Sequence, residues 1–81
     1  MEIDTDRIDE AVLALLYLGL HGDDHRTWKG FDWESLNRLY EKGYIANPIN
    51  RSKSMQFSEE GLKESERLFH ALFGVSETSS K

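Results

Sequence analysis

The fold class follows from residues 32–45, which read DWESLNRLYEKGYI. Asp32 is a favourable N-cap, and apolar side chains recur at helical spacing after it, so we predict a helix over residues 33–42. Gly43 stands where a left-handed residue commonly ends a helix, and Tyr44 is the apolar residue that often follows such a cap. The stretch therefore predicts a sharply terminated amphipathic helix that leads into an extended segment.

A β-hairpin is predicted next in the chain. Residues 44–46 form a short extended run, residues 47–52 have the composition of a turn, and residues 54–57 alternate between polar and apolar side chains. The alternation predicts that the apolar pair faces the core and that Ser54 and Gln56 face solvent.

Helices are predicted on both sides of this unit. A first helix is expected over residues 6–20, and because residues 11–18 are all apolar or Tyr, it should be buried on most sides. Ser58 caps a last helix that ends near Gly74 and carries an apolar stripe. Residues 21–31 show no sustained period and predict a loop with at most about one helical turn.

These elements define the predicted fold class: α+β, helix-dominated, a compact winged-helix-like domain of three helices plus a β-hairpin. We expect one domain over residues 1–74 and a disordered polar tail over residues 75–81.

Two resemblances rest on these residues. The patterns LxxLxxxGYI at 36–45 and MxFSxxGL at 55–62 resemble the recognition helix, wing and following helix of MarR-like and PadR-like regulators. A second resemblance rests on the pattern WKGxDW at 28–33 followed by LxxLxxxGYI at 36–45. Together these two patterns resemble a family of small bacterial proteins known only as a domain of unknown function. The first resemblance implies DNA contact, and the second implies no activity.

Composition places the protein among small intracellular domains. The chain has 81 residues, a net charge of −5 and no cysteine, which fits a reducing compartment. Its acidic start does not resemble a signal peptide, and its longest apolar run is too short to cross a bilayer, so we expect a cytoplasmic protein without membrane contact.

Charge is unevenly distributed along the chain. Residues 1–25 carry one basic and seven acidic side chains, whereas residues 26–53 carry six basic and three acidic ones. If the domain binds DNA, the resemblance implies that the predicted helix enters a major groove and that the hairpin tip approaches phosphate. The acids of residues 1–25 should then be turned away. The candidate nucleic-acid contacts are Arg26, Lys29, Asn37, Arg38, Lys42, Arg51 and Lys53.

A second hypothesis is a protein-interaction domain without nucleic-acid binding. The aromatic cluster Trp28, Phe31 and Trp33 is expected to anchor the 21–31 loop onto the core, and the alternative is an interface anchor, since Trp is enriched at binding hot spots. The last helix offers a surface for a homodimer. DNA binding is the leading interpretation and protein interaction is the alternative.

Enzymatic and metal chemistry are not indicated. The chain has no cysteine nucleophile, no serine in a glycine-flanked turn and no phosphate-binding loop, so we expect no enzyme, no cofactor and no small-molecule substrate. His21 and His25 enclose Asp23 and Asp24, but the spacing fixes no third ligand, so no metal site is predicted.

Overall fold

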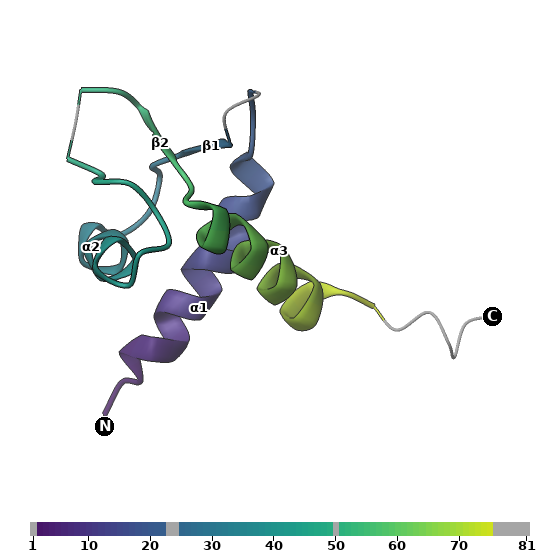
Figure 1. Cartoon of the computed structure of the whole chain (residues 1–81). Helices are drawn as coiled ribbons and strands as arrows, with labels where there is room; N and C mark the ends of the chain where they lie inside the picture. Colours follow the sequence, from purple (N-terminus) through teal and green to yellow (C-terminus); the bar gives the residue numbers. More distant parts are fainter. Residues whose placement is uncertain (1, 23–24, 50, 76–81) are drawn as a thin grey trace.

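The computed structural model describes residues 2–22, 25–49 and 51–75. Three helices and one antiparallel strand pair confirm the α+β, helix-dominated class, in an arrangement consistent with a winged-helix-like layout (Figure 1). In chain order the elements are α1 (Thr5–Leu16), the 3-10 helix η1 (Tyr17–Gly19), β1 (Arg26–Trp28), α2 (Trp33–Glu41), β2 (Ser54–Gln56) and α3 (Glu59–Phe73).

The helix boundaries depend on local hydrogen bonds that the sequence predicted. The Asp32 carboxylate accepts the amide of Ser35 at 3.1 Å, and the Ser58 hydroxyl accepts the amide of Gly61 at 2.9 Å. Gly43 has φ +84°, the left-handed conformation that its position after α2 required. The first helix differs from expectation, because regular α-helix ends at Leu16 and η1 carries the chain onward.

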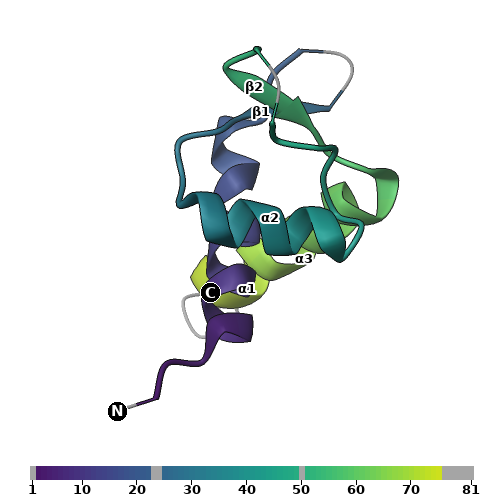
Figure 2. The same cartoon turned by 90° about the vertical axis from the view of Figure 1, so that its left-hand side faces the viewer.

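The strand pairing corrects the predicted loop at residues 21–31. β1 lies in that segment and pairs antiparallel with β2, Thr27 standing opposite Met55. The predicted partner at residues 44–46 contributes one bridge, Ile45 to Phe57, on the other side of the same chain segment. Figure 2 shows β1 and β2 crossing together above α2. The strand is held by Thr27, whose buried hydroxyl donates to the carbonyl of Leu16 at 2.6 Å.

The two faces of β2 also differ from the simple alternation. Met55 and Phe57 are buried as predicted, but Ser54 is buried rather than exposed. Its hydroxyl accepts the Nε–H of Arg26 at 2.9 Å, so the neighbouring strand covers it. Gln56 is exposed, as expected.

One core lies between α1, α2, α3 and the strands. Its buried apolar members are Val12, Leu13, Ala14, Leu16, Leu36, Leu39, Ile45, Met55, Phe57 and Leu68. The first helix is central, as predicted, since four of these residues belong to it. This helix was expected to be buried on most sides, and the exception within its apolar run is Leu18, which is 68% exposed.

Two further expectations concern the membrane and the tail. None of the helices in the described ranges has the length and apolar character needed to cross a lipid bilayer. The predicted tail at residues 75–81 lies outside the described residues except for Val75, which is exposed.

Candidate functional site

An apolar groove lies between η1 and β1. It has a volume of about 320 Å³, and no side chain that lines it is ionisable. The lining residues are Leu15, Leu16, Leu18, Gly19, Thr27, Trp28, Gly30 and Phe31. Leu18 and Trp28 are 68% and 53% exposed, so large apolar side chains border the groove and remain in contact with solvent.

The walls of the groove are fixed by close packing. Thr27 ties β1 to the end of α1, and an added Cβ at Gly19 would approach the Thr27 hydroxyl oxygen to 2.9 Å. The Trp28 ring stacks on the His21 ring with centroids 4.0 Å apart, and the His21 Nδ1 lies 2.7 Å from the Gly19 carbonyl oxygen. The His21 ring therefore covers one face of the indole, and about half of Trp28 remains exposed.

The structure separates the three aromatic residues of the predicted interaction cluster. Phe31 packs against the core and lines the groove, as expected. Trp28 also lines the groove, but the expectation that it folds onto the core is wrong, since half of it is exposed. Trp33 is 52% exposed outside the groove lining, with the Lys29 ammonium 5.9 Å from its ring centroid.

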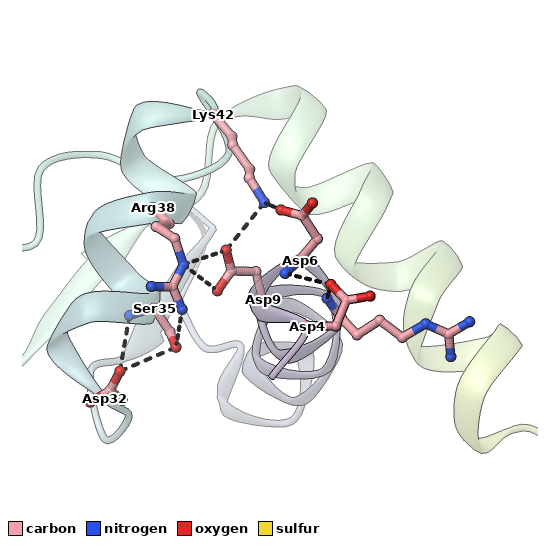
Figure 3. A network of polar contacts seen from close by, with 8 residues as sticks. Asp4, Asp6, Asp9, Asp32, Ser35, Arg38 and Lys42 are labelled. Carbon is pink, nitrogen blue, oxygen red and sulfur yellow. Dashed lines mark hydrogen bonds and ion pairs between the residues drawn. The ribbon is translucent and has the colours of Figure 1, made fainter. Parts of the chain in front are cut away.

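Two of the predicted DNA-contacting cations, Arg38 and Lys42, form ion pairs within the chain (Figure 3). Asp9 of α1 is 1% exposed, and its carboxylate accepts the Nε–H of Arg38 at 3.0 and 2.8 Å. Lys42 donates to the same carboxylate at 3.2 Å and to Asp6 at 3.4 Å. The expectation that the acids of residues 1–25 are turned away from the basic residues is therefore wrong for these two aspartates.

The network shifts the ionisation of its members. Burial disfavours the charged form of Asp9, but the hydrogen bonds from Arg38 and Lys42 outweigh it and lower the pKa of Asp9 below its ordinary value. The hydrogen bond to Asp9 likewise raises the pKa of Arg38. Burial of the Lys42 ammonium acts to lower its pKa, but the contacts with Asp9 and Asp6 together outweigh this and raise the pKa of Lys42. All three groups stay charged near neutral pH, as a structural clamp between α1 and α2 requires.

The remaining basic candidates lie in β1, just after β1 and in the segment before β2. The Lys29 amide donates to the Lys53 carbonyl at 3.2 Å, and Arg26 reaches the hydroxyl of Ser52, the neighbour of Arg51, at 3.4 Å. Arg51 and Lys53 are exposed. Arg26 and Lys29 therefore contact the segment that carries Arg51 and Lys53, through the Ser52 hydroxyl and the Lys53 carbonyl. Asn37 is exposed on α2, apart from that group.

A second pocket, of mixed polarity and about 390 Å³, lies beside the ion-pair network. Its polar lining consists of three network residues, Asp6, Asp9 and Lys42, together with Glu10, Tyr44 and Glu64. Asp23 and Asp24, which the sequence placed beside two histidines, lie outside the described residues. Across the part of the chain that the structure describes, no group of three or more histidine or carboxylate side chains is arranged to hold a metal ion.

The sequence identified part of the groove and missed the rest. Trp28 and Phe31 were singled out as aromatic residues in a segment without helical period. Leu18 was missed because it continues an apolar run that a regular α-helix would bury. The available signal was the pair Gly19 and Gly22, which predicts that regular helix ends close to Leu18.

Comparison with known proteins places the chain in a family. It is 56% identical over 73 residues to the uncharacterized protein y4hR of Sinorhizobium fredii (strain NBRC 101917 / NGR234). The aligned residues cover 90% of this chain and 97% of that relative. No solved structure matches the chain. The resemblance to MarR-like and PadR-like regulators therefore stays a prediction. A family model matches residues 4–75, and the chain belongs to the family that it describes, a domain of unknown function (DUF6429).

Proposed function

We propose that this domain is a non-enzymatic protein-interaction module whose docking surface is the apolar groove between η1 and β1. The observation that carries the proposal is the exposure of Leu18 and Trp28 at the border of a groove without ionisable lining. Single exposed apolar residues are ordinary on protein surfaces, but large ones gathered around a concavity are typical of binding sites.

The chemistry of the groove favours an apolar side chain as the ligand group. The chain is 31% charged, and yet none of the eight lining residues carries a charge. A charged or strongly polar ligand would lose hydration on entry without gaining a partner from these side chains. An aliphatic or aromatic side chain of a protein would instead remove the exposed faces of Leu18 and Trp28 from water.

The proposal can be tested by site-specific photocrosslinking of the full chain inside cells. With p-benzoylphenylalanine in place of Leu18, irradiation should give one or a few discrete protein adducts, and Trp28→Ala should deplete them. The control places the same probe at Glu41, which is exposed on α2 outside the groove lining. A probe at position 18 that gives no discrete adduct, or the same adducts as position 41, contradicts the proposal.

DNA binding is a second candidate. It is favoured by the exposure of Arg51 and Lys53 and by the contacts that hold Arg26 and Lys29 against the segment that carries them. Two observations weigh against it. The chain has a net charge of −5, and Arg38 and Lys42 already neutralise Asp9. Binding through the remaining group would rest almost entirely on phosphate contacts and would therefore depend strongly on salt.

A titration with mixed-sequence duplex at ~50 mM salt separates the two candidates. If the basic group binds phosphate, the log–log salt slope should be about −3.5 for four contacts, and Arg51→Ala with Lys53→Ala should reduce it by about two units. The interaction module predicts no binding at high micromolar protein. A shift in the wild type that this double variant leaves unchanged would contradict phosphate binding at this site.

A further inference from the structure

The end of α3 is a second exposed apolar surface. Residues 70–75 are all exposed, and Leu72, Phe73 and Val75 are 50%, 47% and 83% exposed. The five residues 71–75 carry no charge. Figure 1 shows the C-terminal half of α3 extending away from α1, on the side opposite to α2. Neither α1, α2 nor the strands cover this end of the helix.

The groove and the α3 end lie next to each other across η1. Tyr17 contacts Phe69 with ring centroids 5.2 Å apart, and Phe69 contacts Phe73 at 5.7 Å. Leu18, the residue after Tyr17, lines the groove. No residue of α3 lines the groove, so the chain does not fill it with its own helix end.

We propose that the groove receives the α3 end of a second copy of this chain, and that two copies do so reciprocally in a symmetric dimer. This inference rests on the proposed function and names its partner. The chain itself supplies an exposed, uncharged and apolar segment, which is the chemistry that the groove favours. Because groove and helix end are neighbours, one two-fold axis between the copies can engage both pairs of surfaces and close the assembly.

The available area is consistent with such a dimer. A large aromatic side chain buries roughly 150–250 Å², so the exposed portions of Leu18, Trp28 and the three α3 residues supply several hundred Å² per protomer. A stable interface requires roughly 600–1,000 Å² from each partner. The apolar surfaces thus provide a large part of what is needed, and a dimer of this kind requires polar residues around them to bury the remaining area.

Sedimentation equilibrium of the purified full chain tests the proposal. The wild type should be a dimer, and Trp28→Ala in the groove or Phe73→Asp on α3 should each raise the dissociation constant roughly tenfold or more. Trp33→Ala is the matched control, because Trp33 is as exposed as Trp28 but lies outside the groove lining. It should leave the dimer unchanged. Leu18→Asp is a second groove variant, and circular dichroism verifies that each variant is folded.

Mixing the two variants gives the decisive observation. Trp28→Ala protein retains an intact α3 end, and Phe73→Asp protein retains an intact groove, so the mixed pair should regain one of its two contacts. The mixture should associate measurably where each variant alone does not. A direct α3-to-α3 dimer predicts instead that Trp28→Ala remains dimeric, and that result would overturn the reciprocal arrangement.

The failure of this inference can be told apart from failure of the interaction module. A wild type that stays monomeric at millimolar concentration, together with discrete photoadducts whose mass differs from the dimer, overturns self-association and leaves the module intact. A monomeric wild type without any adduct from position 18 overturns both.

Discussion

At the scale of single residues, Gly61 marks the closest approach between two elements. A Cβ on Gly61 would lie 1.7 Å from the carbonyl oxygen of Tyr44, so the first turn of α3 contacts the backbone that follows α2. Ala normally stabilises a helix by about 1 kcal/mol relative to Gly. Here we expect Gly61→Ala to lose about 2 kcal/mol or more, because backbone must move to admit the methyl group.

Urea unfolding of Gly61→Ala and of a control variant, Gly30→Ala, measures this loss of stability. Gly30→Ala is the control, since a Cβ there meets nothing within 4 Å, and it should change the free energy of unfolding by less than about 0.5 kcal/mol. A stabilised Gly61→Ala protein would show that α3 does not approach Tyr44 this closely.

Asp9 is the residue whose role the sequence concealed most. In the sequence it is one of the seven acids of residues 1–25. It shares a helical face with Leu13 and Leu16, and a charged side chain on an apolar stripe indicates a buried pair. We expect Asp9→Asn to lose about 2 kcal/mol at pH 7, since its hydrogen bonds to two cations are weakened. Asp6→Asn is the matched control on an exposed partner of Lys42 and should cost at most about 0.5 kcal/mol.

The pH dependence of stability gives an independent measurement on Asp9. Because the pKa of Asp9 is lowered on folding, its contribution to stability is complete well above the ordinary aspartate pKa of 3.8 and is lost as the pH falls through the folded pKa. The difference in unfolding free energy between wild type and Asp9→Asn should therefore be constant from pH 5 to 7 and shrink below about pH 4. A difference that grows on acidification would mean that the carboxyl group is protonated in the native state.

At the scale of elements, the sequence predicted what local chemistry determines. The caps at Asp32 and Ser58 and the left-handed Gly43 each depend on residues within one turn, and all three were predicted. β1 was not predicted, because three residues without alternation carry no strand signal and its partner lies 28 residues away. Its formation depends on tertiary contacts, chiefly the bond from Thr27 to α1.

The groove depends on a similar departure from local pattern. If α1 continued as regular helix, Leu18 would share a face with Ala14, which is fully buried. The chain instead changes to η1 at Tyr17, and Leu18 becomes a groove residue. Sequence periodicity assumes one helix geometry throughout, and for that reason it did not identify Leu18 in the aliphatic wall of the groove. The aromatic wall, Trp28 and Phe31, could be identified because these residues lie in a segment without helical period.

Amide hydrogen exchange tests the strand pairing. The amides of Lys29 and Phe57 donate to Lys53 and His25 across the β1–β2 pair, and the amide of Ala46 donates to Gln56 on the other side. All three should exchange slowly and with similar protection, because they open together with one sheet. Protection of Ala46 with rapid exchange at both Lys29 and Phe57 would favour the simple hairpin and contradict β1.

At the scale of the whole molecule, part of the uneven charge distribution stabilises the fold. The acidic segment 1–25 and the basic segment 26–53 suggested a surface for phosphate, but Asp6 and Asp9 of the acidic segment contact Lys42 of the basic one. Part of the polarity seen in the sequence is thus used within the fold, between α1 and α2. Segmental charge alone could not reveal this, since it contains no information on which segments meet.

The small core sets the stability of the molecule. At roughly 0.05–0.15 kcal/mol per residue, a chain of 81 residues has a free energy of unfolding of about 4–12 kcal/mol. Among the described residues, ten buried apolar side chains form the core that supplies it.

Leu16→Ala should lose about 2–5 kcal/mol, because Leu16 is fully buried between the helices. Leu18→Ala, two residues further on, should lose less than about 0.5 kcal/mol, since that side chain lies mostly in solvent. Denaturant unfolding of both variants, monitored by circular dichroism, should show this contrast within one short segment. Equal losses would place Leu18 in the core and remove the aliphatic wall of the groove, and with it the proposed docking surface.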